Sequence, residues 1–169
     1  MIIDLKRIFV NDNSSLPVDY SLDLSTLEYL GEYPLKAPVS IKGVVSNSAS
    51  LVRLVAEISY EYTAPCDRCG KETATKHTVR VEKSLASSIE GEESETILLV
   101  PDMKLDLDEL IYTEVMLSLP MKHLCNQTCK GICSKCGKNL NQGECDCPTK
   151  EIDPRLQALA DLLNNNGKG

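Results

Sequence analysis

Apolar and polar side chains alternate with a period of two through the first half of the chain. The alternation covers 39–45, 54–62 and 75–85, and a Ser-Asn-Ser turn cluster follows the first of these runs. A period of two is typical of strands with one buried face. The pattern therefore predicts a β-rich first half in which 54–62 and 75–85 form the two arms of a hairpin.

Three shorter segments carry weaker versions of the same signal. The runs 2–9 and 20–24 are expected to be strands, and 97–100 is expected to be a short strand that stops at Pro101. Between the hairpin and 97–100 lies an acidic stretch at 90–95, which includes Glu92, Glu93 and Glu95 and is expected to be a solvated loop.

The periodicity changes from two to that of a helix after residue 105. Apolar residues recur at helical spacing over 106–119, acids lie at the positive end of the helix dipole, and Pro120 follows. A second, short helix is expected to begin at Asp153-Pro154, where proline suits the first helical position. Its apolar side is formed by Leu156, Leu159, Leu162 and Leu163.

Length and composition fit one compact body with a small appendage. The chain has 169 residues, of which 42% are hydrophobic, with no Trp and one Phe. The predicted fold class is α+β: an antiparallel β-rich body with one central helix, a cysteine-rich metal-knuckle segment and a short C-terminal helix. The expected boundaries are 1–120 for the β-rich domain, 121–150 for the cysteine-rich segment and 151–169 for the last helix and tail.

Eight cysteines are candidate metal ligands. Four of them follow the pattern C-x2-C-x8-C-x-C, and four thiolates around one tetrahedral zinc ion form the usual closed structural site. These four are Cys133, Cys136, Cys145 and Cys147.

A second knuckle lies at the predicted tip of the hairpin. Cys66 and Cys69 form a C-x2-C pair there, followed directly by a glycine. This pair needs two more ligands, and Cys125 and Cys129 are the natural candidates, although spacing alone leaves the grouping open. The expected cofactor is structural zinc, two ions if both groups fill.

Disulfides, iron–sulfur ligation, deaminase chemistry and thiol redox chemistry fit the cysteines less well than a structural metal. Disulfides need an oxidising compartment, and nothing in the N-terminal residues indicates export. The C-x3-C-x2-C spacing that begins at Cys129 matches radical SAM enzymes, but only 33 residues follow it. A zinc deaminase would need an H-x-E motif before Cys66, and both histidines, His77 and His123, come after Cys69. A thioredoxin-like pair would open a helix, whereas Gly70 favours a turn.

Charge limits the partners that the chain can bind. The net charge is −7, and each zinc ion held by four thiolates would add two negative charges. Only 121–140 differs, because it contains lysines and no acid, but it has no aromatic residue on which RNA bases could stack. The candidate partner-binding residues are Lys122, Lys130, Lys135 and Lys138, with Arg155 at the start of the last helix.

The order of these features resembles one known family. The Cys66–Cys69 pair, a helix ending at Leu119-Pro120, the six later cysteines and the run Asp153-Pro154-Arg155-Leu156 occur together as in the YceD family of large ribosomal RNA subunit accumulation proteins. The resemblance implies a cytoplasmic, non-enzymatic factor that supports processing or accumulation of large-subunit ribosomal RNA. Its implied partner is a large-subunit precursor, through ribosomal RNA or a basic ribosomal protein.

Enzymatic functions are less well supported by the residues. Catalytic zinc keeps an open position and commonly uses His or carboxylate ligands, whereas this chain supplies cysteines and has no phosphate-cradling glycine loop. The alternatives are a zinc-held thiol redox switch and a metal-dependent enzyme acting on RNA. No run approaches the roughly 20 apolar residues of a membrane span, so no membrane partner is expected.

Overall fold

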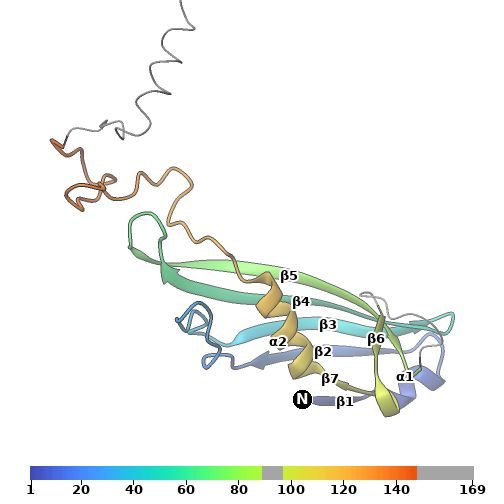
Figure 1. The fold of residues 1–169 in the computed structure, drawn as a ribbon. Coiled ribbons are helices and arrows are strands. Elements are labelled where there is room, and N and C mark those ends of the chain that lie inside the picture. The colour runs from blue at the N-terminus through green and yellow to red at the C-terminus, as the bar shows by residue number, and fades with distance from the viewer. Residues whose placement is uncertain (89–96, 148–169) are drawn as a thin grey trace, which may run out of the picture.

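A five-stranded sheet forms the body of the protein in the computed structural model, which describes residues 1–88 and 97–147 (Figure 1). Neighbouring strands are antiparallel except for the last pair, in which β6 runs parallel to β5. In spatial order the strands are β2 (Ser15–Leu22), β3 (Val39–Ser48), β4 (Leu51–Pro65), β5 (Glu72–Ala86) and β6 (Ile97–Leu99).

The central hairpin confirms the alternation seen in the sequence. β4 and β5 pair along their whole length, from Val52 opposite Leu85 to Pro65 opposite Glu72 at the tip. Every second side chain of β4 is buried, from Val52 to Ala64. The period of two therefore reports one face packed on the core and one face turned to solvent.

The start of the chain differs from the expected strand over 2–9. β1 (Ile2–Asp4) pairs with β7 (Lys104–Asp106) in a separate two-stranded sheet, and the chain then turns into α1 (Lys6–Val10). Leu5 and Ile8 are both buried. Residues three apart face opposite sides in a strand, whereas the helical turn that begins at Leu5, the N-cap of α1, lets both face the core.

The predicted central helix is confirmed as α2 (Leu107–Ser118), which follows a short 3-10 turn, η1 (Pro101–Met103), and β7. Its N-cap is Asp106, whose Oδ1 accepts hydrogen bonds from the backbone N–H of Asp108 and of Glu109. Its buried side chains are Leu107, Leu110, Ile111 and Val115.

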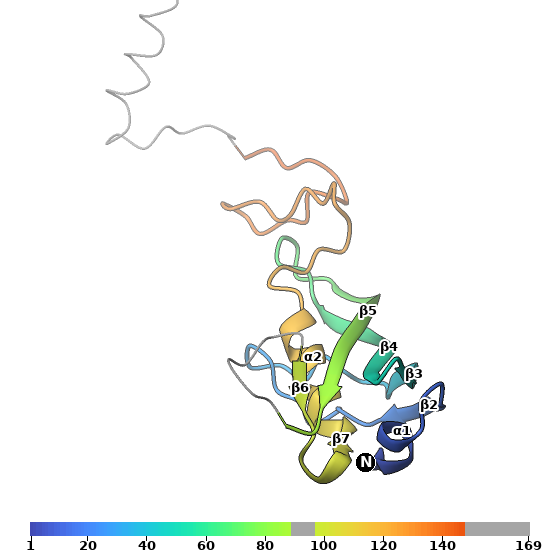
Figure 2. The ribbon, with the colours of Figure 1, turned by 90° about the vertical axis from the view of Figure 1, so that its right-hand side faces the viewer.

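Helix α2 covers one face of the sheet and is tied to it by polar contacts (Figures 1 and 2). The Tyr60 hydroxyl on β4 lies 2.9 Å from Oγ of Ser118 at the end of the helix. On β5, Nζ of Lys83 lies 2.9 Å from a carboxylate oxygen of Glu114. The α+β class is therefore confirmed, with α1 as an additional short helix.

After α2 the chain runs to the tip of the β4–β5 hairpin, and the cysteine-rich segment lies beyond this tip (Figures 1 and 2). This end of the molecule is opposite to the one that carries α1. The expected acidic loop at 90–95 and the expected last helix, including Arg155, lie outside the described residues. The domain boundaries at 120 and 150 stay predictions. Within 1–88 and 97–147, no helix has the length and apolar composition that a membrane crossing requires.

Candidate metal centres

The tip of the β4–β5 hairpin folds into a tight knuckle around Cys66 and Cys69. The N–H of Cys66 donates to the carbonyl of Lys71 at 2.9 Å, and the N–H of Gly70 donates back to the carbonyl of Cys66 at 2.8 Å. Gly70 has a φ of +69°, which glycine adopts at little cost. These bonds turn both cysteine side chains of the pair toward the same point.

The segment after α2 is fastened to this knuckle through His123. The N–H of Asp67 donates to the carbonyl of His123 at 2.9 Å, and the N–H of His123 donates to Oδ2 of Asp67 at 2.7 Å. The His123 ring is buried, with Nε2 2.8 Å from the Thr73 hydroxyl and its edge against Tyr62. His123 therefore stabilises the knuckle through hydrogen bonds and is not a member of the group of four thiols.

The other histidine is also structural. His77 stacks on Tyr60 with ring centroids 5.4 Å apart, and its Nε2 lies 2.9 Å from the Thr75 hydroxyl. The expectation that His77 belongs to the core or its rim agrees with this position.

The fold brings Cys66 and Cys69 together with Cys125 and Cys129. The sulfur of Cys66 lies 3.9 Å from that of Cys129, and the sulfur of Cys69 lies 3.7 Å from that of Cys125. All four sulfur atoms lie within 4.8 Å of one another. A tetrahedral ion with bonds of roughly 2.3 Å to sulfur separates its ligands by about 3.8 Å. A disulfide would need about 2.05 Å. The first group of four cysteines could therefore hold a metal ion.

The second group repeats the local geometry of the first. The N–H of Cys133 donates to the carbonyl of Lys138 at 2.9 Å, and the N–H of Gly137 donates to the carbonyl of Cys133 at 2.9 Å. The hairpin tip shows the same two bonds, and both segments read C-x-x-C-G-K. Cys145 and Cys147 complete this group, and its four sulfur atoms also lie within 4.8 Å of one another.

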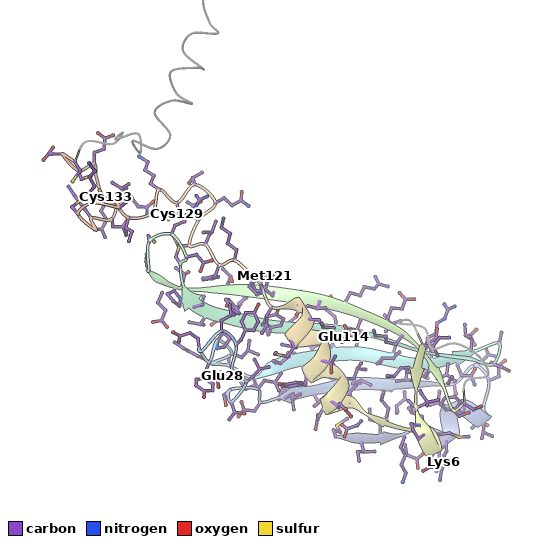
Figure 3. The ribbon with its side chains drawn as sticks, in the orientation of Figure 1. Lys6, Glu28, Glu114, Met121, Cys129 and Cys133 are labelled. Atoms are coloured by element: carbon purple, nitrogen blue, oxygen red, sulfur yellow. The ribbon has the colours of Figure 1, made fainter. Side chains whose placement is uncertain are left out.

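We call residues 66–71 together with 121–147 the cysteine head. Figure 3 shows Cys129 beside the hairpin tip and Cys133 farther from the sheet. Cys66 and Cys129 are buried, whereas Cys136 is exposed. The first group is thus enclosed by the end of the sheet, and the second lies on the outside of the head.

Comparison with known proteins identifies a family whose profile matches most of the chain. The family profile described as "Large ribosomal RNA subunit accumulation protein YceD" matches residues 54–163, which include the whole cysteine head. The chain belongs to the YceD family. No solved structure matches it significantly.

Individual relatives of this YceD chain are distant. A chloroplastic protein of Arabidopsis thaliana named "Large ribosomal RNA subunit accumulation protein YCED homolog 1" is 25% identical over 84% of the chain and 54% of its own length. Its namesake from Zea mays is 24% identical over 83% of the chain and 59% of its own length. An uncharacterized protein of Mycobacterium leprae is 26% identical over 75% of the chain and 60% of its own length. The chain thus spans little more than half the length of these relatives.

Each group of the YceD chain contains a thiol whose pKa is lowered by backbone N–H groups. Hydrogen bonds from backbone N–H groups, that of Cys125 foremost, lower the pKa of Cys66 to about 6. The N–H groups of Cys136 and Lys135 lower the pKa of Cys133 to about 6 in the same way.

Other thiols of the same groups are held protonated by their neighbours. The pKa of Cys125 is raised to about 12, first by its hydrogen bond with Cys129, and that of Cys147 is raised to about 12, first by its hydrogen bond with Cys136. Four thiolates cannot gather unless positive charge compensates them. A divalent cation would supply that charge, and an all-thiol donor set suits a soft, tetrahedral ion such as zinc.

The predicted partner-binding lysines all belong to the head of the YceD chain. The Lys138 ammonium donates to the carbonyl of Glu144 at 2.7 Å. The exposed members of this set are Lys122, Lys130, Lys135 and Lys138. Arg155, the fifth predicted residue, lies outside the described part of the chain.

Sequence reasoning missed three residues of the head. Arg68 and Lys71 add positive charge at the hairpin tip, and the Arg68 guanidinium donates to the carbonyl of Cys129 at 2.8 Å. Asn141 donates from Nδ2 to the sulfur of Cys129 at 3.3 Å. The repeated C-x-x-C-G-K would have indicated Lys71 as the counterpart of Lys138. No sequence signal indicates Asn141.

Proposed function

We propose that this chain supports the accumulation of large-subunit ribosomal RNA by binding a large-subunit precursor and that it catalyses no reaction. The family profile and the names of the plant relatives support the connection to that RNA. The chain spans only part of those relatives, so the proposal concerns the segment that they share.

The proposed cofactor is zinc, one ion in each group of four cysteines. The sulfur separations and the all-thiol donor set support this choice. Four protein ligands fill a tetrahedral ion, which leaves no position for a substrate or an activated water. Each ion would thus hold the head together, while other residues contact the partner. Eight free thiols suit a reducing compartment, which we take to be the cytoplasm.

The working surface in this proposal is the outside of the head. The observation that carries it is the exposure of Lys122, Lys130, Lys135 and Lys138 around two inward-facing thiol groups. Arg68 and Lys71 extend the positive charge to the hairpin tip. A net charge of −7 over the whole chain opposes bulk capture of naked RNA. A precursor that offers phosphates together with a basic ribosomal protein can satisfy both the head and the acidic remainder.

Charge reversal in the head tests this surface. The double variant Lys122→Glu and Lys130→Glu removes two exposed ammonium groups. Lys138 is kept unchanged, because its Nζ donates a hydrogen bond to the carbonyl of Glu144. We expect unchanged thermal unfolding and zinc content, because exposed charges contribute little to stability. We expect reduced co-sedimentation with large-subunit precursors and less mature large-subunit RNA in cells that carry this variant alone.

The matched control reverses two lysines on the body, Lys42→Glu and Lys76→Glu. Both are exposed, so the change in net charge is the same while the head is untouched. If the control loses precursor binding as strongly as the head variant, net charge and not the head sets the association. If the head variant rescues a deletion strain fully, the working surface lies elsewhere.

A further inference from the structure

The two cysteine groups are joined by a very short linker that the hairpin tip clamps. Only residues 130–132 separate Cys129 of the first group from Cys133 of the second. The Arg68 guanidinium donates to the carbonyl of Cys129 at 2.8 Å, and the Arg68 carbonyl accepts from the N–H of Ile132 at 3.1 Å. The first knuckle therefore fixes the direction in which the chain continues from the first group to the second.

Gly131 makes this clamp possible. Its φ is +76°, and a Cβ on it would lie 3.1 Å from the carbonyl oxygen of Arg68. Its own carbonyl accepts the N–H of Leu140 at 2.9 Å, which docks the loop of the second group onto the linker. The positive φ and the close approach of the Arg68 carbonyl both favour a residue without a side chain.

Asn141 extends from the second group's loop to a thiol of the first group. It lies in sequence between Cys136 and Cys145, yet its Nδ2 donates to the sulfur of Cys129 at 3.3 Å. Its Oδ1 accepts from the N–H of Lys130 at 2.8 Å, and its own N–H donates to Oδ1 of Asn139 at 2.9 Å. The amide is thus held on one side by its own loop and on the other by the first group.

Hydrogen bonds to a ligating thiolate orient it and stabilise its charge, and losing such a partner weakens metal binding. The loop that carries Asn141 is closed at both ends by cysteines of the second group. Metal in the second group would therefore fix the loop. The fixed loop would hold the side-chain amide of Asn141 beside the sulfur of Cys129.

We propose that the cysteine head is one cooperative two-metal unit, in which Asn141 is a positioning residue that couples filling of the second group to metal affinity of the first. This inference rests on the metal binding proposed above. Because coupling between two binding sites is reciprocal, metal in the first group must equally strengthen the second.

Two substitutions separate the donor from the other properties of Asn141. Asn141→Asp keeps an oxygen that can accept from Lys130 but removes the N–H donor to Cys129 and adds a like charge. Asn141→Ala removes the donor without adding charge, and it also removes the Oδ1 atom that accepts from the N–H of Lys130. Gln142→Ala is the matched control, because it truncates the neighbouring exposed amide, whose side chain has no hydrogen bond to a thiol within 1–88 and 97–147.

The experiment titrates the full-length, metal-stripped chain with cadmium in competition with a chelator and follows each group by cadmium-113 NMR. The double variant Cys136→Ser and Cys147→Ser, which disables the second group, identifies the signal of the first. We expect the first group to bind cadmium about 10-fold more weakly in this double variant and in both Asn141 variants, as is typical when an outer partner of a metal ligand is lost. We expect its NMR signal to shift in the Asn141 variants and Gln142→Ala to match the wild type. Circular dichroism of the β-sheet should remain unchanged in all of them.

The outcomes distinguish this inference from the proposal beneath it. If neither group binds metal in the wild type, the proposed metal binding fails and the coupling fails with it. If both groups bind but disabling the second leaves the first unchanged, only the coupling is overturned. If Asn141→Asp weakens the first group and Asn141→Ala does not, repulsion explains the effect and the assigned role of the donor is wrong.

Discussion

Asp67 and His123 exchange two hydrogen bonds although they lie 56 positions apart in the chain. One joins the backbone of Asp67 to the carbonyl of His123, and the other joins the backbone of His123 to the Asp67 carboxylate. This pair fastens the segment after α2 to the hairpin tip. It thereby sets where Cys125 and Cys129 meet Cys66 and Cys69.

Replacing Asp67 with Ala should loosen this attachment. The N–H of His123 would lose a charged acceptor, and leaving a donor of this kind unpaired costs about 1–3 kcal/mol. We expect faster hydrogen exchange at the His123 amide and weaker metal retention by the first group. Asp67→Asn, which keeps a neutral acceptor, should lie between Ala and the wild type. Glu144→Ala, an exposed acid whose side chain has no hydrogen bond in the described structure, should change neither measurement. Equal exchange in all four proteins would contradict the role given to this pair.

Metal content is the most direct test of the two groups. Protein purified without added metal should contain about two zinc ions per chain, because each set of four thiols completes one tetrahedral site. Cys133→Ser should lower the content to about one and disorder 130–147 first, since assembly of a site is coupled to folding of its loop. Elemental analysis decides the content. Stoichiometric iron with sulfide, or no metal at all, would refute zinc.

Gly43 should tolerate no side chain. A Cβ built on it would lie 2.5 Å from the carbonyl oxygen of Val55 and 2.7 Å from Cα of Ala56, both in the adjacent strand. Backbone atoms cannot rotate away as a side chain can, so Gly43→Ala should destabilise the protein by about 1–3 kcal/mol in urea unfolding. Lys42→Ala, at the exposed neighbouring position, should stay within about 0.5 kcal/mol of the wild type. A neutral Gly43→Ala would mean that β3 and β4 can separate at this point without loss.

His77 should make the folded state sensitive to mild acid. Burial, followed by the nearby His123, lowers the pKa of His77 in the folded protein below the value of about 6.5 expected in the unfolded chain. The unfolded chain then binds the proton more readily, so the free energy of unfolding falls as the pH drops below about 6.5 and is unaffected above it. His77→Asn removes this contribution. Subtracting the unfolding free energy of His77→Asn from that of the wild type at each pH cancels the contributions of titratable groups common to both proteins. We expect this difference to be flat above pH 7 and to fall between pH 7 and 5. A difference that is flat throughout would show that the ring titrates alike in both states.

The sequence alone determined the elements whose signals are local. Alternation predicts β3, β4 and β5 because one face of each strand is buried. The helical spacing of apolar residues predicts α2, and Asp106 marks its start because the carboxylate caps the first N–H groups. The four cysteines from Cys133 to Cys147 could be grouped because one short loop contains them all. The nature of the candidate metal site was therefore predictable from residue types and spacing.

The tertiary structure decided what meets across long separations. Periodicity reports which side of a segment is buried but not which segment covers it. Hence the contact between Cys66 and Cys129, 63 residues away, depends on how the hairpin tip packs against the chain after α2. The same limit explains why the sequence predicts one strand over 2–9, where the structure has β1 and α1. Its apolar residues fit either period, and only the core decided that Leu5 and Ile8 face the same way. Asn141 is the clearest case, because a polar residue on an exposed loop carries no local signal, and its contact with Cys129 exists only when the two cysteine groups pack together.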